Sequence, residues 1–409
     1  IGGNTVRAEG GINAAETPQQ KKAGIPDTID QFYADTMKGG HNLNDPALVR
    51  TLTTQAKDAV AWLVSLGADL NTVGRAGGAK YPRAHRPTDG SAIGPEVIRV
   101  LWKAAKDRKM DVRTQTRATE IIMKDGRVAG VKATTKDGKV YTIDAKAVVL
   151  AAGGFGANQD MLVKYQPKLK GYATTNQPGA TGDGIILAEH AGAALVDMKQ
   201  IQAHPTAAPD GTLISESVRG DGGILINAEG KRFTNELLTR DVVSAAELKQ
   251  PGRFAWVFWD DATRKSAKLM DSYISMGLAV KGNTVAEIAK AMNVPAAELE
   301  ATLKAYAAGK AAGKDAFGRA DMPQAMQTAP FFAVKVQPAV HHTMGGVKID
   351  TKAEVLNPAG HTIPGLFAAG EVTGGVHGGN RLGGNAQADI VTFGRIAGQS
   401  ADAYLKTAK

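Results

Sequence analysis

An apolar run that ends in a cluster of glycines sets the strongest limit on the fold of this chain. Residues 147–152 read Ala-Val-Val-Leu-Ala-Ala, and Gly153, Gly154 and Gly156 follow directly. A short run rich in β-branched residues and closed by glycines is typical of a buried strand. In open α/β folds the ligand binds where such a strand ends. The run therefore predicts an α/β architecture with a ligand site near Gly153.

The periodicity of apolar residues predicts the other elements. Spacings of three and four indicate helices, whereas alternation bounded by Asp-Gly turns indicates strands. Helices are expected at 29–65, 92–109, 185–193, 241–249, 285–312 and 386–407, and further strands at 111–114, 130–134 and 140–143. The segment 199–324 differs from the sequence on both sides of it. It has short strands and alanine-rich helices, whereas the flanking regions have strands followed by glycines. We expect one discontinuous Rossmann-like α/β domain, 1–198 and 325–409, and an inserted α+β capping domain, 199–324.

Composition excludes several functional classes. No stretch of 18 apolar residues occurs, so no membrane span is expected. The net charge is +9, but no basic stripe interleaved with aromatic residues is present, and nucleic acid is not an expected partner. Cysteine is absent, which excludes iron–sulfur ligation and Cys-x-x-Cys-His haem attachment within these residues. The opening Ile-Gly-Gly-Asn lacks the features of a signal peptide.

The last quarter of the chain concentrates glycines beside a histidine pair, an acid and an arginine. The segments are His341-His342-Thr-Met-Gly-Gly, Ala-Gly-Glu371-Val-Thr-Gly-Gly and Asn-Arg381-Leu-Gly-Gly-Asn-Ala386. Glycines let the backbone approach a flat or phosphorylated ligand. Histidine and arginine bind anionic groups, and the helix expected at Ala386 favours phosphate at its N-terminus. These segments predict a large anionic ligand.

Three motifs in the inserted segment carry candidate acid–base chemistry. They are His204-Pro-Thr, Ser215-Glu216-Ser-Val-Arg219-Gly and Thr-Arg240-Asp. Taken singly, each has an ordinary structural explanation. His204 could be a core histidine, the Glu216–Arg219 spacing could be a helical ion pair, and Arg240 could pair with a neighbouring acid.

Together and in this order, the motifs resemble those of the soluble fumarate reductases, in the fumarate reductase and succinate dehydrogenase flavoprotein family. The resemblance extends from Ile1 to about Lys406. It begins just after the position of the Gly-x-Gly-x-x-Gly βαβ unit with which such flavoproteins usually open, so that unit is expected to be missing from these residues. The resemblance implies non-covalent FAD and the reduction of fumarate to succinate. Hydride would leave flavin N5, and an arginine would supply the proton.

The resemblance also assigns roles to individual residues. The catalytic group would be the proton donor Arg240 with the relay residues Glu216 and Arg219. Substrate would be bound by His204, Ser215, Glu216, His341, Arg381, Gly384 and Gly10. FAD would be held by Asn4, Gly10, Gly11, Ala118, Asp183, His342, Glu371, Ala386 and Gln387. In some relatives carbonyl groups bind a cation, here implied to be sodium, at Thr343, Met344, Gly345, Glu371 and Thr373.

The expected partners also follow from the resemblance. The substrate is a small dicarboxylate, and electrons come from an external donor, a cytochrome or a separate haem domain. A periplasmic location and a role in electron transport during anaerobic respiration are implied as well.

Two departures from the family pattern leave alternatives open. Glu9 stands where relatives carry a small residue before Gly10, and Arg75-Ala76 replaces an apolar pair that closes over the substrate. A more polar wall could admit another unsaturated acid, so reduction of urocanate, methacrylate or an aryl acrylate is the first alternative. His204 favours fumarate over urocanate. Asp221 stands at a position that relatives often fill with asparagine, and it favours the alternative over fumarate. A non-catalytic flavoprotein fragment is the alternative of another class.

Overall fold

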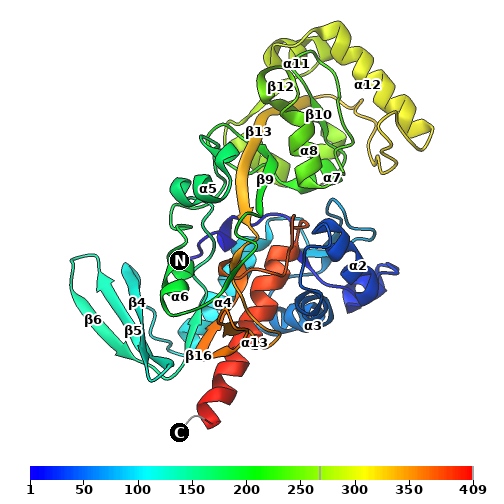
Figure 1. The fold of residues 1–409 in the computed structure, drawn as a ribbon. Helices are drawn as coiled ribbons and strands as arrows, with labels where there is room; N and C mark the ends of the chain where they lie inside the picture. The colour runs from blue at the N-terminus through cyan, green and yellow to red at the C-terminus, as the bar shows by residue number, and fades with distance from the viewer. Residues whose placement is uncertain (267–268, 408–409) are drawn as a thin grey trace.

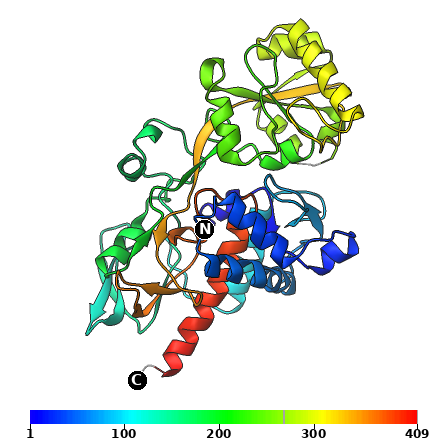
Figure 2. The same cartoon turned by 45° about the vertical axis from the view of Figure 1, so that its right-hand side comes forward.

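Two lobes meet along one long strand in the computed structural model, which describes residues 1–266 and 269–407. The lower lobe holds both termini, and residues from about 208 to 330 build most of the upper lobe (Figure 1). Strand β13 (Phe331–Thr343) runs from the upper lobe into the lower one, as Figures 1 and 2 show. Within the described residues, no helix is long and apolar enough to cross a lipid bilayer.

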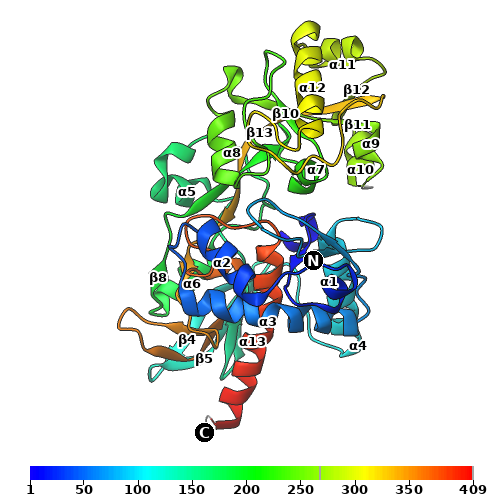
Figure 3. The ribbon, with the colours of Figure 1, turned by 90° about the vertical axis from the view of Figure 1, so that its right-hand side faces the viewer.

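The lower lobe combines small sheets with helices packed around them (Figure 3). Its strands are β1 (Ile12–Asn13), β2 (Thr72–Gly74), β3 (Ala84–Arg86), β4 (Thr116–Lys124), β5 (Arg127–Thr135), β6 (Val140–Asp144), β7 (Val148–Leu150), β8 (Leu195–Val196), β14 (Gly346–Val347), β15 (Glu354–Leu356) and β16 (Thr362–Ala368). Its helices are α1 (Pro18–Lys22), α2 (Ile29–Gly39), α3 (Pro46–Ser65), α4 (Ile93–Asp107), α5 (Gln159–Tyr165), α6 (Asp183–His190) and α13 (Asn385–Thr407). Strand β7 pairs in parallel with β16, and the sheet is ordered β15-β16-β7.

The upper lobe is an antiparallel sheet with helices on both faces. Its order is β10-β11-β13-β12, and β9 pairs with the end of β13 that enters the lower lobe. The strands are β9 (Ile201–Ala207), β10 (Ile224–Ile226), β11 (Ala255–Asp260) and β12 (Ala279–Gly282); the helices are α7 (Glu216–Gly220), α8 (Arg240–Glu247), α9 (Asp261–Arg264), α10 (Leu269–Ser275), α11 (Val285–Met292) and α12 (Ala296–Ala311). Because side chains alternate along a strand, Phe332 and Val334 enter one apolar core and Phe331 and Ala333 enter the other.

The mixed α/β class expected from the sequence is confirmed. The buried apolar residues of the lower lobe come from residues 12–198 and 340–397, whereas both upper cores draw on residues 208–336. The domain limits themselves, 1–198 with 325–409 and 199–324, stay a prediction.

Most expected elements lie within a few residues of the observed ones, and two need correction. The helix expected at 29–65 is two helices, because His41 and Asn42 adopt positive φ and Asp45 caps the start of α3. The strand expected at 111–114 is wrong. Asp111 and Arg113 form an exposed ion pair of 2.6 Å there, and the strand begins only at Thr116.

A buried arginine joins the N-terminal helices to the strands that border the ligand region. Arg83 donates from Nη2 to Asp27 Oδ1 at 2.8 Å and to Asp35 Oδ2 at 2.7 Å, and its side chain is 1% exposed. It precedes β3, which pairs with β1. On β1, Asn13 Nδ2 donates to the carbonyl oxygen of Gly383 at 2.7 Å. Arg83 therefore anchors the strands that hold part of the glycine-rich segment.

Replacing this arginine should weaken the fold. Arg83→Met leaves two buried carboxylates without their partner, and we expect a loss of about 3–5 kcal/mol in the free energy of unfolding. The matched control is Arg50→Met, which removes the exposed pair with Asp30 and should cost no more than about 1 kcal/mol. Chemical denaturation followed by circular dichroism measures both. Equal losses in the two variants would contradict the role of Arg83.

Candidate active site

A cleft of about 560 Å³ lies where the two lobes meet. Its volume is that of a small-molecule site. Of the residues singled out in the sequence, those that line it are Asn4, Gly10, Gly11, His204, Ser215, Glu216, Arg240, His341, His342, Glu371, Arg381, Gly384, Ala386 and Gln387. The fold thus brings most of the predicted residues into one cavity.

Local strand geometry explains why neighbouring side chains reach this cleft together. On β9, Gln202 and His204 are two residues apart and therefore share a face. On β13, consecutive residues His341 and His342 would point to opposite faces of a regular strand. The register of β13 against β9 shifts between Val340 and His342, and such a bulge redirects side chains. Both histidines consequently line the cleft.

A buried ion pair joins the first residue of α7 to the first residue of α8. Glu216 Oε2 accepts from Arg240 Nε at 2.7 Å and lies 2.7 Å from its Nη2. Glu216 Oε1 accepts from the backbone N–H of Gly77 at 2.9 Å, and Arg240 Nη1 donates to Gln202 Oε1 at 3.2 Å. Burial raises the pKa of Glu216, but the charges of Arg240 and Arg219 outweigh it and hold the pKa below its ordinary value. Glu216 is therefore a carboxylate at neutral pH.

Arg219 lies behind this pair rather than on the cleft wall. Its Nη1 donates to the carbonyl oxygen of Glu236 at 2.6 Å, and its Nε and Nη2 are buried without a hydrogen-bond partner among the described residues. Arg232 and Arg319 both donate to the carboxylate of Glu236. Arg319 Nη2 also donates to the carbonyl oxygen of Arg219 at 2.8 Å. Burial lowers the pKa of Arg219. This network fixes Arg219 through both its side chain and its backbone.

The histidines of the cleft are neutral hydrogen-bonding groups. Burial, followed by the charge of Arg240, lowers the pKa of His204 and of His341 well below the ordinary value. His204 Nδ1 accepts from the backbone N–H of Thr206 at 3.2 Å, so the neutral ring carries its proton on Nε2. That Nε2 is buried and has no partner among the described residues. His204 therefore offers a hydrogen-bond donor to a ligand.

The net field of the cleft favours an anion. Burial and the charge of Arg240 lower the pKa of Arg381 to about 9, which leaves its guanidinium charged at neutral pH. Four arginines line the cleft, Arg7, Arg75, Arg240 and Arg381. Arg240 is paired with Glu216, whereas Arg381 Nε is buried without a hydrogen-bond partner in the described chain. A buried charge is costly unless it is paired. A ligand with carboxylate groups would supply the missing negative charge.

A second part of the cleft offers polar backbone and side-chain groups to a flat ligand. The position where Gly10 would carry a Cβ has no atom within 4 Å. His342 Nε2 and Gln387 Oε1 are buried without a partner in the described chain. Glu371 Oε1 accepts from the N–H of Thr343 at 3.0 Å, and burial raises the pKa of Glu371. These groups surround open space beside the cationic end.

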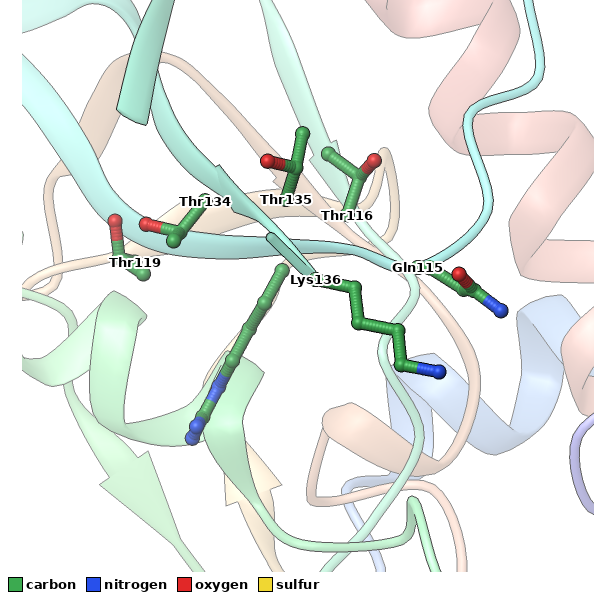
Figure 4. A pocket seen from close by; sticks show the side chains of 7 residues that line it. Gln115, Thr116, Thr119, Thr134, Thr135 and Lys136 are labelled. Carbon is green, nitrogen blue, oxygen red and sulfur yellow. The ribbon is translucent and has the colours of Figure 1, made fainter. Parts of the chain in front are cut away.

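Ala118 and Asp183, which the resemblance assigned to the cofactor, do not line this cleft. Asp183 begins α6, and its Oδ2 accepts from Arg117 Nε at 2.8 Å. Ala118 lies on β4 between Arg117 and Thr119, which both line an open hollow. The other residues that line this hollow are Gln115, Thr116, Thr134, Thr135 and Lys136 (Figure 4). The roles of both residues stay predictions.

The segments of the suggested sodium site lie side by side. The N–H and hydroxyl of Thr343 both donate to Glu371 Oε1, and a Cβ placed on Gly346 would lie 2.2 Å from the carbonyl oxygen of Val372. No cluster of three His, Cys, Asp or Glu side chains that could hold a metal occurs in residues 1–266 and 269–407. Carbonyl ligands at Thr343, Met344, Gly345, Glu371 and Thr373 stay a prediction.

Sequence reasoning missed several residues that hold the candidate catalytic groups. Gln202 Nε2 donates to the carbonyl oxygen of Arg381 at 2.7 Å, and Thr175 Oγ1 lies 2.7 Å from His341 Nδ1. The spacing of two between Gln202 and His204 is a signal that could have revealed Gln202. Gly77 gave no such signal, because it contacts Glu216 across 139 positions of sequence.

Glu9, noted in the sequence as a departure, lines the same cleft. Its Oε2 accepts from the hydroxyl of Tyr273 at 2.7 Å. Burial raises the pKa of Glu9 to about 8, against a smaller lowering by the Tyr273 hydrogen bond. Since this pKa lies above neutrality, the carboxyl group is mostly protonated at pH 7.

The chain is similar in sequence and in fold to several flavoproteins. A family model described as FAD binding domain matches residues 1–386. A fumarate reductase (cytochrome) of Shewanella frigidimarina is 49% identical over 409 residues, which cover 99% of this chain and 72% of that protein. A urocanate reductase of Eggerthella lenta is 35% identical, over 98% of this chain and 69% of that protein. Among solved structures, the open conformation of a flavocytochrome c3 fumarate reductase matches with a TM-score of 0.80 at 48% identity, covering 98% of this chain and 72% of that chain.

The protonation of Glu9 can be tested spectroscopically. We expect infrared difference spectra between pH 6 and pH 10 to contain a carboxylic acid C=O band that disappears with a midpoint near pH 8, because burial raises the pKa of Glu9 to about 8. Glu9→Gln is the control and should lack this band. A wild-type difference spectrum identical to that of Glu9→Gln would show that Glu9 does not titrate between pH 6 and pH 10.

Proposed function

The chain belongs to the FAD binding domain family and, within it, to the flavoprotein fumarate reductases, and on that premise we propose that it reduces fumarate to succinate with FAD. The observation that carries this proposal is the buried Glu216–Arg240 pair in a cleft with uncompensated positive charge. A dicarboxylate would supply the balancing charge, and Arg240 would donate a proton to it.

The chain's residues fit a flavin ring beside the substrate. The open space at Gly10 and the unpartnered atoms His342 Nε2 and Gln387 Oε1 provide a flat, polar border. We assign the ring to Gly10, Gly11, His342, Ala386 and Gln387, which line the cleft next to the cationic end. Asn4, Glu371, Ala118 and Asp183 would hold the rest of the non-covalently bound cofactor. When bound in its reduced form, FAD supplies the hydride, from N5 to one alkene carbon.

The substrate carboxylates would be held by charged and neutral donors together. Arg381 offers a guanidinium, whose planar fork matches a carboxylate. His204 Nε2–H, the hydroxyl of Ser215 and His341 add single hydrogen bonds, and Gly384 lines the same wall. As hydride arrives, negative charge grows toward one carboxylate. Preorganised donors then stabilise that charge without having to reorient.

The proton would come from Arg240. An arginine side chain is a poor acid in water, so it can serve as the donor only if its proton is replaced at once. Glu216 contacts both Nε and Nη2 of Arg240, so a proton that reaches Glu216 can pass to Arg240 as Arg240 gives its own proton to the substrate. Arg219, whose charge lowers the pKa of Glu216, would transfer a proton to that carboxylate and take one up from solvent in turn. The relay therefore runs from Arg219 through Glu216 to Arg240.

The remaining partners follow from chemistry that residues 1–409 lack. These residues contain no cysteine to hold an iron–sulfur cluster or a Cys-x-x-Cys-His haem. The proposed electron donor is a cytochrome or a haem domain outside them. Sodium bound to the carbonyls near Thr343 and Glu371 would fix the end of β13. We further propose that the protein acts in anaerobic electron transport in the periplasm.

Another unsaturated acid is the second candidate substrate. Glu9, Arg75 and Ala76 line the cleft, and a smaller, more polar wall there would admit an unsaturated acid other than fumarate. Urocanate, methacrylate or an aryl acrylate would each place a different group against that wall.

The reaction can be tested with an artificial electron donor. We expect the purified protein, supplied with FAD, to oxidise reduced methyl viologen rapidly when fumarate is added and slowly with urocanate or methacrylate. Flavin absorbance after gel filtration provides the control for cofactor binding. Oxidation with urocanate alone would replace fumarate as the substrate, and absence of both flavin and oxidation would indicate a non-catalytic fragment.

The proton donor can be tested by substitution. Arg240→Ala should lower kcat for fumarate by a factor of about 10²–10⁴, the usual contribution of a positioned general acid, while FAD binding is unchanged. The control is Arg127→Ala, an exposed arginine on β5 outside the cleft. If Arg240→Ala retained the wild-type kcat, another group would be the proton donor.

A further inference from the structure

One buried tyrosine of the upper lobe connects two residues of the cleft lining, Ser215 and Glu9. Tyr273 lies on α10, and its ring is fully buried in the core that contains Trp259. Its hydroxyl accepts from the backbone N–H of Ser215 at 2.9 Å and donates to Glu9 Oε2 at 2.7 Å. A tyrosine hydroxyl has one proton to donate. Because Ser215 is the donor in the first bond, that proton points to Glu9.

The two ends of the bridge carry groups of the proposed reaction. Ser215 is the N-cap of α7, the helix that contributes Glu216 and Arg219. Glu9 directly precedes Gly10 and Gly11, which line the part of the cleft assigned to the flavin ring. The hydrogen bonds that join Glu9, Tyr273 and Ser215 thus connect the segment that contains Gly10 to the start of α7.

Most other contacts between the lobes near the cleft cannot set the distance between the backbone at Gly10 and Ser215. The pairs His41–Asp241 and Arg75–Asp321 are exposed, with side-chain exposures between 39% and 48%. Exposed pairs are screened by water and contribute little. The bond from the N–H of Gly77 to Glu216 is buried, but it reaches the lower lobe at a different segment. The Tyr273 bridge therefore acts on the segment that contains Gly10.

We propose that Glu9 and Tyr273 are positioning residues, whose hydrogen bond sets the separation between the flavin-side backbone at Gly10 and the substrate-binding Ser215. The inference rests on the proposed function, since it concerns how the substrate is held over the ring. Either protonation state of Glu9 can accept this bond, because the Oε2 atom needs only a lone pair. The other carboxyl oxygen, Oε1, is the atom that carries the proton in the neutral form.

Loss of the bridge should affect substrate binding more than the chemical step. Without it, Ser215 and α7 lose a buried anchor, while the Glu216–Arg240 pair and its contacts with Gly77 and Gln202 remain. One neutral buried hydrogen bond corresponds to a change of about 2- to 10-fold in an equilibrium constant. The apparent KM for fumarate should rise by that factor, whereas kcat should change less.

A double-mutant cycle tests the proposal on the FAD-loaded protein. The variants are Tyr273→Phe, Glu9→Ala and the two combined, with Glu9→Gln as the conservative replacement. We expect each of the first two to raise KM by about 2- to 10-fold. The double variant should be no worse than Tyr273→Phe alone, because loss of the hydroxyl already removes the bond to Glu9 together with the bond from Ser215 N–H. Glu9→Gln should restore a value close to wild type, because its amide oxygen also accepts from Tyr273.

Two controls separate positioning from a structural effect and from failure of the reaction itself. Tyr306→Phe removes another buried hydroxyl of the upper lobe, which donates to the carbonyl oxygen of Gly222 at 3.3 Å, and should leave KM unchanged. Succinate binding, followed by the perturbation of flavin absorbance, repeats the cycle without turnover. Wild-type protein that binds succinate but does not reduce fumarate would overturn the proposed function only. Additive effects of the two substitutions, or no effect of either, would overturn the bridge.

Discussion

The arrangement of the cleft depends on the buried ion pair between Glu216 and Arg240. Breaking such a pair on one side costs several kcal/mol, because the remaining charge stays buried. Polar atoms that the ion pair does not use have other partners in the fold. Glu216 Oε1 accepts from the N–H of Gly77, and Arg240 Nη1 donates to the side chain of Gln202. Gln202 also donates to the backbone of Arg381. The same few hydrogen bonds thus hold the proposed proton donor and the proposed carboxylate-binding arginine in one frame.

The charge distribution around that pair decides the protonation of its neighbours. Arg240 and Arg381 lie near the histidines and, together with burial, keep His204 and His341 neutral. A neutral ring offers a hydrogen bond without adding another charge to a crowded site. Glu9 is the opposite case, because it gains a proton at neutral pH. Burial raises its pKa, and no positively charged side chain lowers it. Two carboxyl groups in one cleft therefore differ in charge because their surroundings differ.

The site is shared between two lobes, which β13 connects. One end of β13 lies in the sheet of the upper lobe, and the other end pairs with β9 and delivers His341 and His342 to the cleft. The inter-lobe bonds of Glu216 and Tyr273 cross the same region. Substrate and cofactor would thus be held from opposite sides, so the relative position of the lobes affects both binding and proton transfer.

The sequence by itself determined the α/β class, most helices and the motifs that carry the chemistry, because periodicity, glycine clusters and short motifs are local properties of the chain. It predicted the residues of the ion pair, and it singled out Glu9. It did not reveal Gly77, Thr175 or Tyr273 as partners, because these contacts join segments far apart in the chain and leave no local pattern. Gln202 could have been found from its spacing to His204, but its bonds to Arg240 and Arg381 could not. It also misassigned residues 111–114, where alternation was mistaken for a strand although the side chains pair in solvent. Only the tertiary structure decided which charges are buried together. Burial keeps His204 neutral and Glu9 mostly protonated, whereas the charges of Arg240 and Arg219 keep the buried Glu216 ionised.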